Sequence, residues 1–116
     1  MRRTLLAVAV LVTAAGFKAG EQPPDVSGSY TSNWGSVVLH QRHDRVTGEY
    51  EHQHGRIDGV LDGNLLRYAW HENDGDGHGV FVIATDGELV GTWGIGDDDT
   101  RGGGWRLAPA AAAIAR

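Results

Sequence analysis

Acidic side chains and histidines gather in a few short segments of this chain and are its first candidates for chemistry. The segment Asp74-Gly75-Asp76-Gly77-His78 spaces carboxylate and imidazole groups two residues apart, as calcium-binding loops do. It lacks the bidentate glutamate that closes an EF-hand loop. His52, His54 and His78 are of the residue type that holds zinc or copper, but their spacing matches no compact metal site. We therefore expect no metal ligands and no cofactor.

The sequence contains no familiar catalytic motif. It has no Gly-x-Ser-x-Gly elbow, no phosphate-binding glycine loop and no His-Glu-x-x-His helix. The absence of cysteine excludes a cysteine nucleophile, a thiolate zinc site and a disulfide. A carboxylate pair of the glycoside hydrolase kind, formed by Glu72 and the Asp97-Asp98-Asp99 run, is the enzymatic alternative. We expect a binding protein without catalytic residues.

Aromatic side chains suggest a binding site instead. Tyrosine and tryptophan offer large apolar surfaces with one polar end, and the chain has three tyrosines and four tryptophans. A histidine and a glutamate among such rings would supply hydrogen bonds to a small, partly apolar ligand. The candidate ligand-binding residues are Tyr30, Trp34, Tyr50, His52, Tyr68, Trp70, Glu72 and Trp93.

Antiparallel β-structure is expected to position these side chains. An apolar-x-Gly-x-apolar pattern recurs four times, and its period of two is that of a strand. It occurs at Val26-Gly28-Tyr30, Val46-Gly48-Tyr50, Ile57-Gly59-Leu61 and Leu89-Gly91-Trp93. The 18 glycines of the 116-residue chain indicate many turns. Eight strands are predicted near residues 26–32, 35–42, 45–53, 56–62, 64–73, 78–85, 88–96 and 102–108.

Tight turns predict how these strands pair and which side chains share a face, because a slip of one residue inverts every side chain. Turns are expected at His43-Asp44, His54-Gly55, Asp62-Gly63-Asn64 and Asp86-Gly87. The resulting pairs are Val37 with Tyr50, Leu39 with Gly48, Tyr50 with Gly59 and His52 with Ile57. The inward face is predicted to continue through Leu66, Tyr68, Trp70, Val80, Val82, Leu89, Gly91 and Trp93.

The predicted fold class is all-β, an eight-stranded antiparallel up-and-down meander that closes into a small barrel. Closure removes the two edge strands, and an eight-stranded barrel has room for side chains or for one small ligand. A two-sheet β-sandwich is the alternative, because several apolar residues fall on the predicted outward face. These are Val38, Val60, Leu65, Phe81, Ile83 and Val90. A second copy of the protein or the alanine-rich tail could cover them.

In such a meander the connections alternate between the two ends of the barrel. One end is expected to hold both termini and the tight turns, and the other Asn33-Trp34, His52 to Gly55, Glu72 to His78 and Asp97 to Arg101. The second end carries most of the chemically distinctive residues, so the ligand site is predicted there. His52 is expected to point inward near Ile57.

The N-terminus has the features of an export signal. Arg2 and Arg3 precede an 11-residue apolar run, Leu5 to Ala15, which is too short to span a bilayer and ends in small residues. We predict a signal peptide over residues 1–15, or 1–19 with a later cleavage site. A linker over 16–25, a barrel over 26–108 and a flexible or short helical tail over 109–116 are expected to follow. The protein is thus predicted to be secreted or periplasmic.

The charge balance indicates the class of partner. Without Arg2 and Arg3, eight basic residues face 15 acidic ones, a formal charge of −7. Such an acidic chain is expected to bind neither nucleic acid nor an anionic membrane. A small molecule or another protein is the expected partner, and a homo-oligomer through the outward apolar face is a further possibility.

Two resemblances support the barrel. The span from Trp34 to Trp93 resembles small exported bacterial β-barrel proteins of unsettled function, distantly similar to avidin-like and lipocalin-like barrels. The residues that carry it are Trp34-Gly35, Val37, Leu39, Gln41, Val46-Thr47-Gly48-Glu49-Tyr50, Gly55, Ile57, Gly59, Trp70, Gly79, Phe81 and Gly91-Thr92-Trp93.

More specifically, Ser27 to Tyr50 is similar to the opening strands of the avidin family. The shared segments are Gly28-Ser29-Tyr30, Gly35-Ser36 and Thr47-Gly48-Glu49-Tyr50. By this resemblance Ser36 and Tyr50 match the serine and tyrosine that bind the biotin ring oxygen. Ser32 stands in place of the asparagine and His52 in place of the second serine, so only half of that set is present.

The sequence therefore predicts an exported, non-enzymatic binding module for a small, partly apolar ligand in or at the mouth of the barrel. A protein-binding envelope module, such as an exported inhibitor or adaptor, is the alternative.

Overall fold

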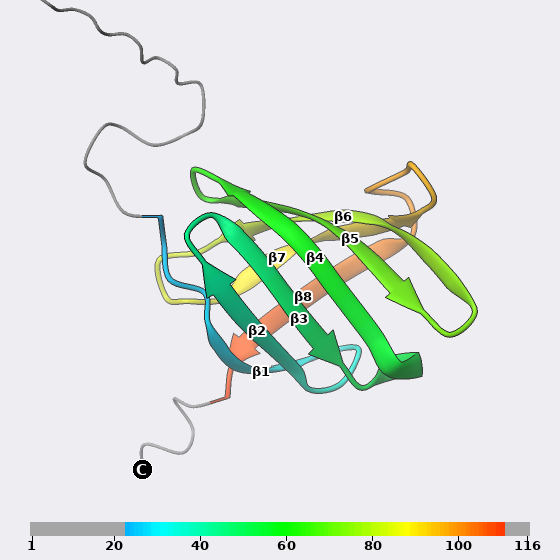
Figure 1. Cartoon of the computed structure of the whole chain (residues 1–116), viewed down its shortest axis with the longest axis horizontal. Helices are drawn as coiled ribbons and strands as arrows, with labels where there is room; N and C mark the ends of the chain where they lie inside the picture. The colour runs from blue at the N-terminus through cyan, green and yellow to red at the C-terminus, as the bar shows by residue number, and fades with distance from the viewer. Residues whose placement is uncertain (1–22, 111–116) are drawn as a thin grey trace, which may run out of the picture.

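A computed structural model describes residues 23–110 as a closed antiparallel barrel of eight strands (Figure 1). The predicted signal peptide and most of the predicted linker lie outside the described residues, as does the tail from residue 111. The strands are β1 (Gly28–Ser32), β2 (Val37–Arg42), β3 (Arg45–Tyr50), β4 (Gly55–Asp62), β5 (Leu65–Glu72), β6 (Gly75–Ile83), β7 (Leu89–Ile95) and β8 (Gly103–Pro109). A single turn of 3₁₀-helix, η2 (His52–His54), joins β3 to β4. Within residues 23–110 no helix is long and apolar enough to cross a membrane.

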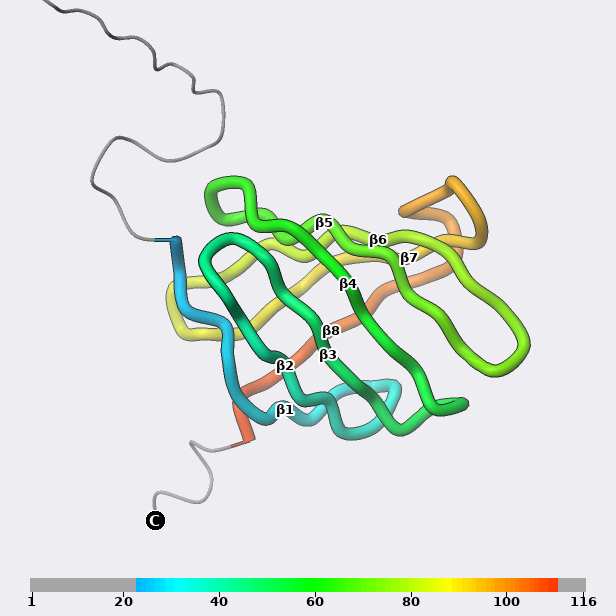
Figure 2. The backbone as a smooth tube through the Cα atoms, in the orientation of Figure 1, coloured from blue at the N-terminus to red at the C-terminus, as the bar shows by residue number. Residues whose placement is uncertain are grey.

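The meander closes between its first and last strands. β1 and β8 pair antiparallel through Tyr30 with Pro109, Thr31 with Ala108 and Ser32 with Leu107. In Figure 2, β8 runs back beside β1. The closed, eight-stranded barrel predicted from the alternation is thus confirmed, and the two-sheet sandwich is not formed.

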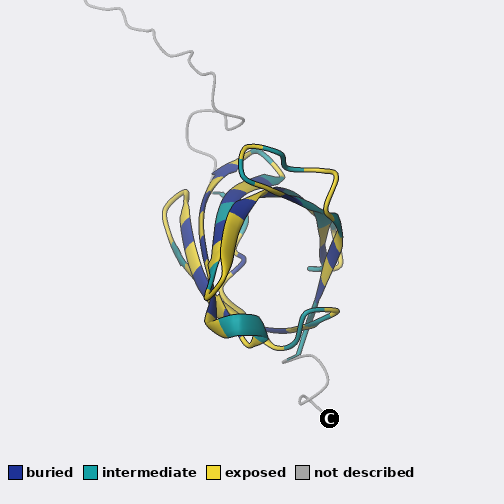
Figure 3. Ribbon diagram, turned by 90° about the vertical axis from the view of Figure 1, so that its right-hand side faces the viewer, coloured by how far each residue is buried: buried dark blue, intermediate teal, exposed yellow. Residues whose placement is uncertain are grey.

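Alternate residues of each strand face the interior, as the bands of buried and exposed residues in Figure 3 show. Aliphatic side chains such as Val46, Leu61, Leu66 and Leu89 fill the end near the β2–β3, β4–β5 and β6–β7 turns. Aromatic side chains fill the middle and the opposite end. The fully enclosed core is continuous, and it includes Tyr30, Tyr50, Tyr68, Trp70, Phe81 and Trp105.

Large rings fit inside this narrow barrel because they lie against glycines of the neighbouring strand. Tyr50 is paired with Gly55, and a methyl group placed on Gly55 would lie 2.0 Å from the Tyr50 Cζ atom. Tyr68 lies over Gly79 in the same way, with a corresponding distance of 2.2 Å. Aromatic rings that cover glycines also let strands coil tightly without leaving voids. The glycine pattern is therefore a packing requirement of the core.

The prediction of which β6 side chains point into the barrel, Val80 and Val82, was wrong. Phe81 is fully buried and Ile83 packs against the core, whereas Val82 is 46% exposed. The reason is the β6–β7 turn, in which Ala84 N–H donates to the Glu88 carbonyl and Gly87 has φ +91°. This leaves a three-residue loop where a two-residue loop was expected. With one extra loop residue, Ile83 pairs with Leu89. Each β6 side chain therefore lies on the opposite face of the sheet from the one predicted.

Two further connections differ from the prediction. Tyr50 pairs with Gly55 and not with Gly59, because β3 ends at Tyr50 and a four-residue loop containing η2 follows. His52 therefore lies in the loop and not opposite Ile57. The segment from Glu72 to His78 is not a long loop, since Glu72 pairs directly with Gly75 around a two-residue turn.

The corrected facing of β6 predicts contrasting effects of two neighbouring substitutions. Phe81→Ala should lower the free energy of unfolding by about 3–5 kcal/mol, because it leaves a cavity among Tyr68 and Trp105. Val82→Ala, at an outward position, should cost less than about 1 kcal/mol. Urea denaturation followed by circular dichroism measures both. A larger loss for Val82→Ala would contradict this facing.

The packing of Tyr50 on Gly55 predicts a non-additive pair of substitutions. Gly55→Ala should destabilise the protein by about 3 kcal/mol, since the new methyl group collides with the ring. In a Tyr50→Leu background the same substitution should cost much less. Gly104→Ala is the matched control, because a methyl group there meets only the Gly91 carbonyl oxygen at 3.7 Å. Equal costs of Gly55→Ala in both backgrounds would refute the ring contact.

Candidate functional site

A cavity of about 180 Å³ opens at the end of the barrel that carries the β1–β2, β3–β4, β5–β6 and β7–β8 connections. In Figure 1 the β3–β4, β5–β6 and β7–β8 connections lie on the right and the β1–β2 connection at the lower centre, whereas both described termini lie on the left. The cavity is lined by Trp34, Tyr50, His52, Trp70, Glu72, Asp74, Gly75, Trp93, Ile95 and Trp105. All four tryptophans of the chain are in this set.

One wall of the cavity is formed by Trp34, Trp70 and Trp93. The rings of Trp34 and Trp93 are 5.7 Å apart at an interplanar angle of 84°, and those of Trp70 and Trp93 are 5.9 Å apart at 87°. Edge-to-face contacts of this kind are favourable for aromatic pairs. The Trp93 ring is thus nearly perpendicular to the rings of both Trp34 and Trp70.

The deeper part of the cavity is closed by Trp105 and Tyr50, whose rings are 4.9 Å apart. Trp105 Nε1 donates to the Ser32 hydroxyl at 3.1 Å, and that hydroxyl donates to the Gly35 carbonyl at 2.7 Å. Ser32 also accepts the backbone N–H of Trp34. One serine therefore ties the closing ring on β8 to the loop that carries Trp34.

Glu72 is the polar centre of the site. The Tyr50 hydroxyl donates to Glu72 Oε2 at 2.7 Å, and His52 Nε2 lies 3.9 Å from Glu72 Oε1. The Glu72 side chain is only 17% exposed, against 39% for His52. The His52 ring also contacts that of Trp34, with centroids 4.8 Å apart. A carboxylate with one oxygen already bonded is therefore held beside the aromatic wall.

The loop that carries His52 is anchored to the next turn of the barrel. Gln53 and His54 both have positive φ, which turns the chain sharply after His52. The Gln53 carbonyl accepts the backbone N–H of Asn73 at 3.1 Å, and the Asn73 side chain bonds His54 Nδ1 at 3.0 Å. These contacts hold His52 above Glu72.

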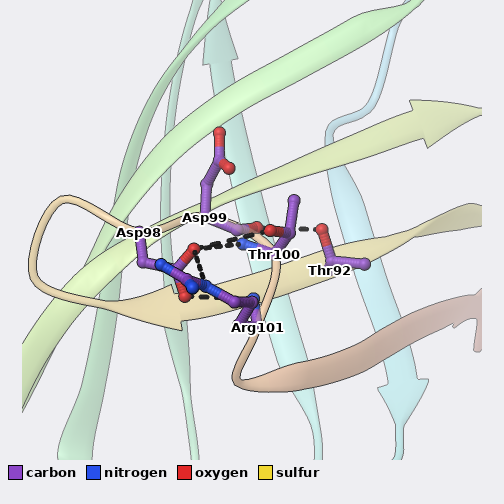
Figure 4. A network of polar contacts seen from close by, with 5 residues as sticks. All are labelled: Thr92, Asp98, Asp99, Thr100 and Arg101. Carbon is purple, nitrogen blue, oxygen red and sulfur yellow. Dashed lines mark hydrogen bonds and ion pairs between the residues drawn. The ribbon is translucent and has the colours of Figure 1, made fainter.

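The β7–β8 loop is built around Asp98 (Figure 4). Its carboxylate accepts the backbone N–H groups of Thr100 and Arg101 at 3.3 and 3.0 Å, and the Arg101 guanidinium lies 3.6 Å away. Desolvation acts to raise the pKa of Asp98, but these hydrogen bonds and the arginine charge outweigh it and lower the pKa. Thr92 Oγ1 donates to the Asp99 carbonyl. Asp98 thus orders the loop and does not line the cavity.

Six of the eight candidate ligand residues meet at the cavity: Trp34, Tyr50, His52, Trp70, Glu72 and Trp93. The other two do not line it. Tyr30 lies toward the opposite end, where its hydroxyl donates to the Val26 carbonyl. Tyr68 stacks on Phe81 below the cavity, and its hydroxyl donates to the Thr92 carbonyl.

Sequence reasoning missed Trp105, Asp74, Gly75 and Ile95 as lining residues. Trp105 had a usable signal, because Trp105 and Leu107 are large apolar residues two positions apart with Arg106 between them, as on an inward strand face. The run Gly102-Gly103-Gly104 before them obscured it. Of the two serines that the avidin resemblance singled out, Ser32 is bonded to Trp105 and Ser36 is exposed outside the cavity.

Among residues 23–110, no three histidine or acidic side chains are grouped so that they could hold a metal ion. His78 does not line the cavity, and its Nδ1 bonds the Gly96 carbonyl.

Comparisons with protein-family models, with curated proteins and with solved structures find no match to this chain.

The environment of the tyrosines predicts how stability depends on alkaline pH. Burial raises the pKa of Tyr30, Tyr50 and Tyr68, and the Glu72 hydrogen bond and charge raise that of Tyr50 further. A raised pKa in the folded state means that stability is complete below pH 10 and is lost above it, where unfolded tyrosines ionise. Above pH 10 the free energy of unfolding should fall by about 1.4 kcal/mol per pH unit for each of Tyr50 and Tyr68, with a smaller contribution of the same sign from Tyr30.

Absorbance at 295 nm, recorded with circular dichroism during an alkaline titration, tests this. The three tyrosines should ionise only together with loss of structure. A tyrosine that titrates near pH 10 in the folded protein would contradict its burial.

Proposed function

We propose that this protein is an exported, non-enzymatic binding module whose barrel mouth holds a small, partly apolar molecule. The observation that carries the proposal is the aromatic cavity of about 180 Å³ with a largely buried carboxylate in its wall. Ligand sites are typically concave and mostly apolar, with a few fixed polar groups that orient the ligand. This cavity has that composition.

The size of the cavity bounds the ligand. An apolar cavity of about 150 Å³ accommodates benzene in another protein, so this one suits a single ring or a headgroup of similar size. The rest of a larger ligand would extend past Ile95, which is 65% exposed at the rim. Ring contacts and hydrogen bonds already hold the walls, so little side-chain freedom would be lost on binding.

A substitution that fills the cavity tests the proposal. Gly75 lines the cavity, and a methyl group placed on it would lie 3.9 Å from Trp70, an ordinary contact distance. Gly75→Leu should therefore occupy the mouth without disturbing the fold. Gly104→Leu is the matched control, since Gly104 is exposed on the outer wall and offers similar space.

The probes are toluene, p-cresol, 3,3-dimethylbutan-1-ol and choline, followed through the four indole N–H signals in ¹⁵N-edited NMR spectra. We expect saturable shifts with at least one probe for the parent and Gly104→Leu, and at least a tenfold weaker response for Gly75→Leu. No saturable shift with any probe, or an equal response of Gly75→Leu, would refute a ligand site in the mouth and leave the outer surface as the candidate for function.

A further inference from the structure

We infer that the ligand class of this site is a methylated ammonium cation, bound by the tryptophan walls and the Glu72 carboxylate. This inference rests on the proposed function, since it names the ligand of the same cavity. Three features of the described residues support it: the aromatic walls, the charge inside the cavity, and the further acidic residues around its mouth.

The aromatic walls suit a cation that needs no hydrogen bonds. Trp34, Trp70 and Trp93 come from three separate elements and meet at steep angles around one space. The face of an indole ring carries negative potential, and tryptophan is the strongest of the aromatic residues in attracting cations. Methylated ammonium groups are recognised by such rings because their charge is spread over an apolar surface.

Apart from the His52 imidazole, the charged side chains that line the cavity are acidic. Glu72 and Asp74 are the acidic residues of its lining, and no lysine or arginine is among the residues of 23–110 that line it. Glu72 Oε2 accepts the Tyr50 hydroxyl, while the His52 imidazole lies 3.9 Å from Oε1. A cation in the cavity would offset a carboxylate that is only 17% exposed. An anionic ligand would meet the same carboxylate as a repulsive charge.

Acidic residues around the mouth of the cavity add to its negative potential. The connections at this end and the strand residues beside them carry Glu51, Glu72, Asp74, Asp76, Asp97, Asp98 and Asp99. Within these segments, residues 33–36, 51–54, 72–76 and 96–102, Arg101 is the only arginine or lysine, and it is paired with Asp98; the other basic groups are the imidazoles of His52 and His54. A concave site with one sign of charge raises the local concentration of oppositely charged ligands.

Hydrogen-bonding capacity separates a methylated from an unmethylated ammonium group. A primary ammonium has three N–H donors to satisfy, and few acceptors in this largely aromatic lining could receive them. A quaternary, fully methylated group has no N–H donor to leave unsatisfied and buries its methyl groups against the rings. The lining therefore favours the methylated form.

Choline and its neutral isostere 3,3-dimethylbutan-1-ol provide the test, because a quaternary carbon replaces the nitrogen at nearly constant shape. At about 0.15 M salt, matched with sodium chloride, we expect choline to bind the parent protein at least tenfold more tightly, as measured by the indole N–H shifts. Glu72→Gln keeps an acceptor for the Tyr50 hydroxyl and should weaken choline binding about tenfold while leaving the isostere unchanged. Asp76→Asn, which removes one charge from the same end outside the cavity, should change choline binding less than about twofold.

The outcomes separate this inference from the proposed function. If the isostere binds as tightly as choline, or tighter, the mouth is a ligand site but the cation assignment is overturned. If Asp76→Asn weakens choline binding as much as Glu72→Gln does, the attraction is a general effect of the acidic end and the assignment of Glu72 is overturned. If neither compound nor any other probe gives a saturable shift, the proposed function itself fails.

Discussion

The packing of aromatic rings on glycines is the constraint on which the rest of this structure depends. Eight strands enclose a narrow interior, and a side chain opposite each large ring would leave no space for it. Gly91, for example, lies in register between Phe81 and Trp105, whose rings are 5.4 Å apart. The glycines also permit the strong coiling that closure requires. The same glycines thus make room for the core rings and allow the barrel to close.

The same packing determines where the filled core ends and the cavity begins. Tyr68, Phe81 and Trp105 contact one another and occupy the middle of the barrel, so the open space begins only above Trp105. Tyr50 connects the two regions. Its ring lies on Gly55 and against Trp105, and its hydroxyl holds Glu72 in the cavity wall. The polar centre of the site is therefore positioned by a residue of the core.

Much of the fold could be predicted from the sequence because strand alternation and turn residues are local signals. The His43-Asp44 turn predicted the pairing of Val37 with Tyr50 correctly. The facing of β6 was wrong, because Asp86-Gly87 fits both a two-residue and a three-residue loop, and only packing of Phe81 in the core separates them. His52 was placed at the correct end for an incorrect reason, since the four-residue loop before β4 has no clear sequence signal. The period-two pattern of Trp105 and Leu107 indicated an inward face, but the hydrogen bond that fixes Trp105 in the cavity wall crosses the β1–β8 pairing, which joins distant parts of the chain.

The pairing of β1 with β8 is the seam of the barrel, where the first strand meets the last. Three residue pairs join β1 to β8, whereas eight join β5 to β6. The Asn33 side chain extends the seam in the manner of a backbone amide, donating to the Gly104 carbonyl and accepting the Arg106 N–H. Contacts between distant segments form late in folding, because the chain entropy lost in closing the loop must be offset first. Trp105 lies on β8 and donates to the Ser32 hydroxyl of β1 across the seam, so the inner wall of the cavity is fixed when the seam closes. A molecule held there would stabilise the closed barrel over an opened one, and its binding would slow the opening of the seam.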